Sequence, residues 1–226
     1  MRAWQACEPA AGAFEPGKAG ALVVGSGGRE HALAWALERS GLFGRVFCAP
    51  GNAGTPNPLP VAATDAAGLV EACRAHGVQF VVVGPEVPLA GGLADRLREA
   101  GLAVAGPSAK AARIEASKSF AKVLMERAGV PTAPFRIFYD PDRAEAFVRQ
   151  AGRPLVVKAD GLAAGKGVRV CDTPEQALAA VRELMVERRL GDAGRMVVIE
   201  ERLQGEERSL MVVTDGERAC LLPLAR

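Results

Sequence analysis

The chain has 226 residues, with 28 Lys and Arg against 26 Asp and Glu, and only 5% of the residues are aromatic. The nearly balanced charge argues against nucleic acid or an anionic membrane as a partner, and the few aromatic side chains argue against a surface that stacks bases. No apolar run approaches the length of a membrane-spanning helix. Five scattered cysteines without a CxxC pair, with only two histidines, indicate reduced thiols in a cytoplasmic protein rather than a zinc site.

Residues 1–20 lack the apolar core of a secretory signal, and we expect them to form a disordered extension. The residues that follow alternate between continuous apolar runs and amphipathic segments, which indicates a parallel sheet covered on both faces and so a Rossmann-like domain over residues 21–122. We expect strands at 21–24, 45–48, 79–84 and 102–106, and helices at 30–39, 65–76, 89–100 and from Ser108, as N-cap, to about residue 128.

The pattern changes between residues 120 and 130, and we place a second domain at 123–226. A short glycine loop joins the strand that ends at Lys158 to the strand that begins at Val168, which predicts an antiparallel hairpin and an α+β architecture. The expected strands are 136–139, 154–158, 168–171, 196–201, 209–214 and 219–224, and the expected helices are 142–151 and 174–187.

In the first domain, three loops each follow a predicted strand: GSGGREHA (25–32), APGNAGT (49–55) and GPEVPLAGG (84–92). The carboxyl ends of parallel strands share one edge of a sheet, where ligands bind in such folds. The candidate ligand groups are the backbone of Gly27 and Gly28 and the side chains of Asn52 and Glu86.

The first of these loops does not predict a nicotinamide cofactor. Glu30 stands where the dinucleotide fingerprint has its third glycine, and no acidic residue closes the second strand. From the residues alone, a phosphate site for a smaller ligand and a simple tight turn remain equally good interpretations.

The loop KADGLAAGKGV (158–168) is rich in glycine and positive charge, but it is not a Walker A loop. Three residues separate Gly161 from Gly165, and Lys166 is followed by Gly167 instead of Ser or Thr. Lys158 ends an apolar strand, where an ammonium group is costly unless an anion neutralises it. The pattern therefore favours phosphate binding by Lys158 and the loop.

Two other charged stretches carry less information by themselves. Lys118 taken alone is typical of a solvated helix face. The stretch 196–209 ends a strand with Glu200 and Glu201 and continues to Glu207, which suits adenine and ribose contacts but, taken alone, is better explained as a charged turn.

Together and in this order, the motifs GSGGREHALAW, APGNAGT, VVVGPEVPLAGGLAD, GPSAKAARIEASKSFAK, VVKADGLAAGKGV, GDAG and VIEERLQGEERSL closely resemble the glycinamide ribonucleotide synthetases (phosphoribosylamine–glycine ligases), ATP-grasp enzymes of purine biosynthesis. The resemblance runs from residue 21 to residue 225. It implies a Rossmann-like pre-ATP-grasp domain followed by an incomplete ATP-grasp domain.

The resemblance also implies a reaction. ATP phosphorylates the carboxylate of glycine, and the amine of 5-phosphoribosylamine then attacks, which gives glycinamide ribonucleotide, ADP and phosphate. The implied cofactors are ATP and Mg²⁺ or Mn²⁺, the partners are these small molecules, and the family members are monomers in the cytoplasm.

By resemblance, specific residues acquire roles. The catalytic candidates are Lys158 and Lys166, and the segment 163–167 resembles a lid over the nucleotide phosphates. Gly27, Gly28, Asn52 and Glu86 resemble the face that binds phosphoribosylamine. The expected nucleotide contacts are Lys118, Lys158, Gly165, Lys166, Gly167, Glu200, Glu201, Leu203 and Glu207.

Members of the family are about twice as long as this chain. We therefore expect a fragment without turnover, in which the metal ligands and the rest of the ATP-grasp domain are missing, and we assign no metal ligand within it. The alternatives are a non-catalytic nucleotide-binding module completed by a separate chain, and a sibling ATP-grasp enzyme of purine metabolism.

Overall fold

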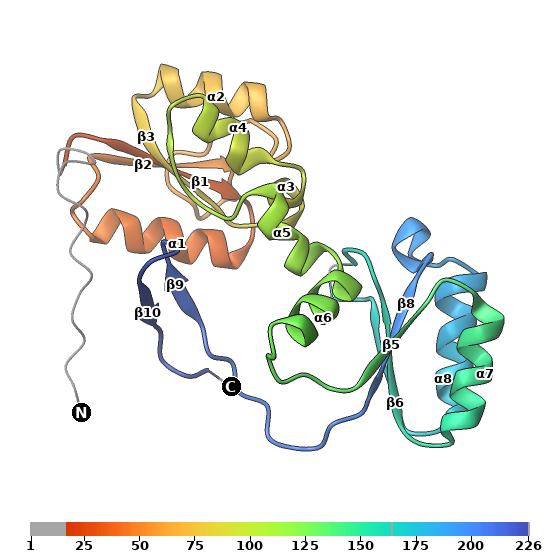
Figure 1. The fold of residues 1–226 in the computed structure, drawn as a ribbon. Helices are drawn as coiled ribbons and strands as arrows, with labels where there is room; N and C mark the ends of the chain where they lie inside the picture. Colours follow the sequence, from red (N-terminus) through yellow and green to blue (C-terminus); the bar gives the residue numbers. More distant parts are fainter. Residues whose placement is uncertain (1–16, 164, 226) are drawn as a thin grey trace, which may run out of the picture. The chain divides into compact units, whose positions relative to one another are not determined.

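The computed structural model describes residues 17–163 and 165–225 (Figure 1). The described chain forms two compact units, one that ends at Arg202 and one that begins at Leu203. Most of the expected N-terminal extension, residues 1–16, lies outside the described residues. Ala19 is already buried and Gly20 is the first residue of a strand, so the first sheet begins one residue earlier than expected.

The first sheet is parallel throughout, as the sequence predicted. Its four strands have the order β2-β1-β3-β4. These strands are β1 (Gly20–Gly25), β2 (Arg45–Pro50), β3 (Val78–Val83) and β4 (Ala103–Ala105), and the helices that accompany them are α1 (Gly28–Arg39), α2 (Ala66–Ala75), α3 (Glu86–Ala90) and α4 (Leu93–Glu99).

Both faces of this sheet are covered, which explains why β1 is buried along its whole length. Leu22 and Val24 belong to one apolar cluster, with residues of α2 and α4, whereas Ala21 and Val23 belong to another, with Ala34 of α1. Alternate residues of a strand point to opposite faces, so a strand buried on both sides must be apolar at every position. Figure 1 shows α1 on one face and α2 and α4 on the other.

Two helices expected to be continuous are each divided in two. The segment 89–100 breaks at Gly91 and Gly92, because Gly92 adopts a left-handed conformation with φ +83° between α3 and α4. The segment 108–128 breaks at Ser117, whose extended backbone (φ −135°, ψ 112°) separates α5 (Ala109–Ala116) from α6 (Lys118–Arg127). Ser108 caps α5 as predicted, since its side chain accepts a hydrogen bond from the backbone of Ala111.

The second sheet is antiparallel, with the order β5-β8-β6-β7. Helices α7 and α8 pack on one face and α6 lies on the other (Figure 1). Its elements are β5 (Phe135–Phe138), α7 (Pro141–Ala151), β6 (Leu155–Ala159), β7 (Val168–Cys171), α8 (Pro174–Val181), the π-helix η1 (Arg182–Val186), the 3₁₀ turn η2 (Gly191–Gly194) and β8 (Val197–Glu201).

The predicted hairpin around the glycine loop is confirmed, and the α+β character of this half is confirmed with it. The helix expected at 174–187 is α-helical only to Val181 and continues as η1. The domain boundary expected after residue 122 falls inside α6, whose first residues are bonded to the second sheet through Asp160. We therefore propose Ser117 as the boundary.

The unit that begins at Leu203 contains one antiparallel hairpin, β9 (Val212–Thr214) with β10 (Ala219–Leu221). Both strands are shorter than the expected 209–214 and 219–224. A bridge between Ser209 and Ala225 extends the pairing. The carboxylate of Asp215 accepts hydrogen bonds from the backbone N–H groups of Glu217 and Arg218, which closes the connecting turn.

Candidate functional site

The face of the second sheet opposite α7 and α8 combines apolar side chains with a cation. The register pairs Lys158 with Val168 and Val156 with Val170, so these four side chains lie on the same face of β6 and β7. Val168 is 38% exposed and Val170 is 59% exposed. Exposed valines side by side on a sheet form an apolar surface that a flat ligand can cover.

A buried carboxylate lies beside this surface. Glu200 of β8 pairs in register with Val156 and is only 4% exposed. The ammonium of Lys158 lies 2.9 Å from Oε1 of Glu200, and the ammonium of Lys122 lies 2.9 Å from Oε2. Two cations around one carboxylate leave a net positive charge at the floor of the site.

The two lysines are held differently. The ammonium of Lys122 also contacts Oγ1 of Thr132 at 2.7 Å and the carbonyl oxygen of Ala133 at 3.4 Å, so a buried charge has several acceptors. Oε1 of Glu200 faces Lys158 as an ion pair but receives no hydrogen bond of good geometry. Lys158 is thus held by charge alone, and its partly exposed ammonium can turn towards an anion.

Lys122 is a candidate site residue that the sequence interpretation missed. A lysine on a helix is normally solvated, and nothing in the local sequence announces a carboxylate partner on a distant strand. The available signal was spacing: Lys122 follows Lys118 by one helical turn, and residues four apart lie on the same side of a helix.

Lys118 lies at the end of α6 that is bonded to the sheet. Its ammonium donates to the carbonyl oxygen of Gly161 at 3.1 Å, and its backbone N–H donates to the carbonyl oxygen of Asp160. The Asp160 carboxylate accepts from the backbone N–H of Ser119 at 2.6 Å and from the hydroxyl of Ser117. These bonds fix the start of α6 at the end of β6, so Lys118 is not the solvated cation that its local sequence suggests.

The glycine loop is a tight connection. Gly165 has φ +78°, and the backbone N–H of Lys166 donates to the carbonyl of Ala163 at 2.8 Å. A β-carbon at Gly167 would lie 2.9 Å from the side chain of Ala163, so the close packing here requires glycine. Ala164 lies outside the described residues, whereas Lys166 is described and exposed.

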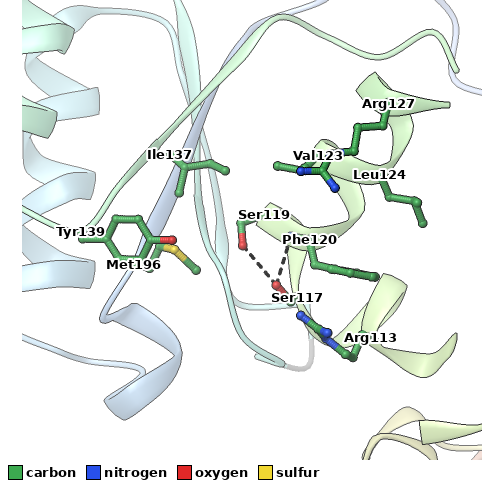
Figure 2. A pocket seen from close by; sticks show the side chains of 10 residues that line it. All are labelled: Arg113, Ser117, Ser119, Phe120, Val123, Leu124, Arg127, Ile137, Tyr139 and Met196. Carbon is green, nitrogen blue, oxygen red and sulfur yellow. Dashed lines mark hydrogen bonds between the residues drawn. The ribbon is translucent and has the colours of Figure 1, made fainter. Parts of the chain in front are cut away.

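A cavity of about 460 Å³ opens beside the start of α6, in the size range of small-molecule sites. Figure 2 shows α6 on one side and Ile137, Tyr139 and Met196 on the other. A second hollow, of about 450 Å³, shares Tyr139 and Met196 with it and reaches Asp160 and Gly161. The residues that line the first cavity are Arg113, Ser117, Ser119, Phe120, Val123, Leu124, Arg127, Ile137, Tyr139 and Met196.

Open space therefore surrounds the end of β6, close to the carbonyl that Lys118 contacts. None of Lys118, Lys158 and Lys166 is among the residues that line either hollow. Lys158 instead lies on the sheet face, against Glu200, and Lys118 contacts Gly161 just beyond the end of β6.

The three glycine-containing loops of the first sheet meet as expected. The side-chain amide of Asn52 donates to the carbonyl of Ser26 at 2.9 Å, and the ion pair of Arg29 with Glu86 spans 3.9 Å. The N–H of Gly51 donates to the carbonyl of Gly25. Asn52 and Glu86 therefore belong to one loop cluster at the carboxyl edge of the sheet.

One predicted anion donor in this cluster is already engaged. The N–H of Gly27 donates to Oε2 of Glu30 at 2.8 Å, and Glu30 is 5% exposed. A β-carbon at Gly25 or Gly84 would lie within 2.4 Å of the Glu30 side chain, which explains both glycines. Glu30 thus occupies the position that an anion would share with Gly27, and Gly28 remains as the predicted donor.

The remaining nucleotide candidates are Glu201, Leu203 and Glu207. The N–H of Glu201 donates to the carbonyl of Pro134, and its carboxylate pairs with Arg153 at 3.3 Å. Leu203 and Glu207 belong to the C-terminal unit, where Leu203 is 66% exposed and Glu207 lines a hollow with Gly205, Glu206 and Ser209. Their role in nucleotide binding stays a prediction.

Within the described part of the chain, no group of three or more His, Cys, Asp or Glu side chains is arranged to hold a metal ion. Burial raises the pKa of the thiols of Cys48, Cys73 and Cys171, to about 11 for Cys73, so they are not nucleophiles at neutral pH. Across the same described residues, no helix is both long and apolar enough to span a membrane.

Two family models match the chain in sequence order. The N domain of phosphoribosylglycinamide synthetase matches residues 20–115, and its ATP-grasp (A) domain matches residues 116–226. The chain belongs to the phosphoribosylglycinamide synthetase family. This confirms the family that the motifs resemble.

Relatives of this synthetase family agree. The phosphoribosylamine–glycine ligase of Neisseria meningitidis serogroup B is 49% identical over 207 residues, which cover 90% of this chain and 48% of the relative. The crystal structure of the phosphoribosylamine–glycine ligase of Thermotoga maritima superposes with a TM-score of 0.72 at 31% identity, over 92% of this chain and 50% of that one. The chain spans about half the length of the curated relatives it matches.

A more distant neighbour shows the ATP-grasp fold alone. It is the biotin carboxylase domain of Hydrogenobacter thermophilus 2-oxoglutarate carboxylase, solved with ADP and magnesium. It is 20% identical, with a TM-score of 0.62, over 82% of this chain and 44% of that one.

Proposed function

We propose that this chain binds ATP on the open face of its second sheet and contributes that site to a ligase that joins glycine to 5-phosphoribosylamine. The observation that carries the proposal is the Lys122–Glu200–Lys158 cluster beside exposed valines, in which Lys122 and Glu200 are buried and Lys158 is partly exposed. A net positive charge next to an apolar floor suits a ligand that has a flat ring at one end and phosphates at the other.

In this arrangement the purine ring covers Val156, Val168 and Val170. The phosphates extend towards Lys158 and the end of β6, where Lys118 is fixed by Asp160 and Gly161. Preorganised cations of this kind stabilise the charge of a phosphoryl group during transfer without reorganising at that moment. Lys166 adds a third cation from the exposed glycine loop.

The same residues explain how a hydrolysable acyl phosphate could be protected. In the proposed reaction the glycine carboxylate takes the terminal phosphoryl group, and the amine of phosphoribosylamine displaces phosphate to form the amide. The glycine loop (Ala163, Gly165–Gly167) excludes water from the transferring group. The loop cluster of the first sheet, with Gly28, Asn52 and Glu86, receives the ribose phosphate and hydroxyl groups of the second substrate.

Magnesium accompanies ATP in this proposal and neutralises part of its phosphate charge. Among the described residues, no group of three or more His, Cys, Asp or Glu side chains is arranged as a metal cage. Mg²⁺ is commonly held by substrate phosphates with one or two carboxylates, so ATP itself supplies part of its coordination.

Calorimetric titration with a non-hydrolysable ATP analogue, with and without Mg²⁺, tests the site. We expect saturable binding in the parent and about ten-fold or weaker affinity in Lys158→Met, because a charge-assisted contact to phosphate is lost. The matched control is Lys110→Met, which removes an exposed cation of α5. No saturable binding by the parent, or equal loss in both variants, would refute the nucleotide site.

The ligase reaction is tested separately, through ADP release that depends on both glycine and 5-phosphoribosylamine. Release by this chain alone would support the reaction and would overturn the expectation that the fragment has no turnover. Nucleotide binding without such release, restored by a separately added chain, would instead support a binding module completed by a partner.

A further inference from the structure

Arg169 of β7 connects the glycine loop to the helical layer behind the sheet. Its Nη1 donates to the backbone carbonyl of Lys166 at 2.7 Å and to that of Val168 at 3.1 Å. Its Nε and Nη2 donate to the two carboxylate oxygens of Glu183, at 3.0 Å and 2.6 Å. One planar guanidinium thus engages two backbone carbonyls and a carboxylate, which the single ammonium of a lysine cannot reproduce.

The Glu183 end of this connection is attached to the core of the second sheet. Glu183 lies in the π-helix η1, whose neighbouring residues Leu184 and Met185 are buried in the core of the second sheet. Single π-helical turns are rare and are frequently found at functional sites. The hydrogen bonds from Arg169 lower the pKa of Glu183, so the pair is fully charged at neutral pH.

The loop end is fixed in backbone but not in side chain. The N–H of Lys166 is bonded to Ala163, its carbonyl is bonded to Arg169, and the carbonyl of Gly167 accepts from the N–H of Ala159 at 2.8 Å. The Lys166 side chain itself is exposed. The position of the Lys166 backbone is therefore defined, whereas its ammonium is free to contact a ligand.

We propose that Arg169 is a positioning residue that anchors the backbone of Lys166 to η1 through Glu183, and so sets where the Lys166 ammonium meets the nucleotide phosphates. The nucleotide part of this inference rests on the proposed function, whereas the anchoring itself does not. Arg169 holds the backbone of Lys166 at its carbonyl and leaves the side chain free to move. Less backbone entropy is then lost when the ammonium of Lys166 binds a phosphate.

Limited proteolysis with an endoproteinase that cleaves after lysine tests the anchor, with cleavage sites identified by mass spectrometry. In Arg169→Met we expect cleavage after Lys166 to become about five-fold faster or more, because local opening of the loop is less costly. Glu183→Gln should give a smaller increase at the same bond. The control, Arg149→Met, removes an exposed arginine that pairs with Glu145 on α7, and should leave this rate unchanged.

Cleavage after Lys158 provides an internal reference in the same digest, since this residue lies within β6. Faster cleavage after Lys166 alone supports anchoring. A parallel increase after both lysines would mean that Arg169 only stabilises the sheet, and an unchanged rate after Lys166 would mean that it does not hold the loop. Either result overturns the proposal.

A double-mutant cycle then tests whether Arg169 acts through Lys166. The affinity for the ATP analogue is measured in Arg169→Met, in Lys166→Met and in the double variant. We expect each single variant to bind about three- to ten-fold more weakly and the double variant to be little weaker than Lys166→Met. Fully additive losses overturn the positioning role. Failure of the parent to bind nucleotide refutes the proposed function and this positioning role, but leaves the proteolysis result on anchoring intact.

Discussion

Replacing Lys122 by methionine is expected to destabilise the second sheet strongly, although the residue lies on a helix that carries several other charges. Methionine matches the length of the lysine stem but lacks the ammonium at its end. The substitution leaves Oε2 of Glu200 without its cation and removes the contacts to Thr132 and to the carbonyl of Ala133. The effect is thus that of breaking a buried ion pair and not of deleting a surface charge.

The structure sets the size of this effect. The side chains of Lys122 and Glu200 are 8% and 5% exposed, so solvent cannot replace the lost contact. Removing one partner of a buried pair typically costs about 3–5 kcal/mol. Lys158 remains 2.9 Å from Oε1 and compensates part of the charge, which places the expected loss near the lower end, about 3 kcal/mol. That is a large share of the roughly 5–15 kcal/mol by which domains are stable.

Urea unfolding followed by circular dichroism, with hydrogen exchange of β8 as a local probe, measures this loss. Lys110→Met on α5 is the matched control and should change the free energy of unfolding by less than about 0.5 kcal/mol. The variants Lys122→Met and Glu200→Gln should couple by about 1 kcal/mol or more. A loss below about 1 kcal/mol in Lys122→Met, with additive effects in the double variant, would refute the charge cluster.

Three further outcomes follow from the structure. Gly194→Ala should lower the free energy of unfolding by about 1–3 kcal/mol in urea titrations, because its β-carbon would lie 2.2 Å from the carbonyl oxygen of Leu184. Burial raises the pKa of the Cys73 thiol from 9.0 to about 11, so Cys73 should resist alkylation at pH 8. The melting temperature of the parent should fall as the pH rises from 9 to 11, because the unfolded chain loses this proton before the folded one does, and it should fall less in Cys73→Ala. Hydrogen bonds from Arg182 lower the pKa of Glu145 below 4.5. The parent should therefore melt at a higher temperature than Glu145→Gln above pH 4.5, and this difference should vanish on acidification.

Much of the fold follows from local patterns. Continuous apolar runs predicted β1, which is buried along its whole length, and most of β3, in which only Gln79 is polar and exposed. The short glycine loop predicted the antiparallel pairing of β6 with β7. Two breaks were not predicted, for different reasons. The glycine pair at 91–92 is a local signal that the sequence interpretation overlooked, since glycine is a poor helix former and Gly92 has φ +83°. At Ser117 helix-forming residues continue, and the break depends on contacts with the distant Asp160.

The sequence by itself determined the alternation of strands and helices, the glycine loop and the placement of Lys158 at a strand end, because each depends on neighbours within a few residues. Only the tertiary structure decided that Lys122 is buried against Glu200, that Asp160 holds the start of α6, and that Arg169 connects Lys166 to Glu183. The reason is electrostatic: whether a charged side chain is solvated or buried depends on a partner that is distant in sequence, and no local pattern encodes that partner.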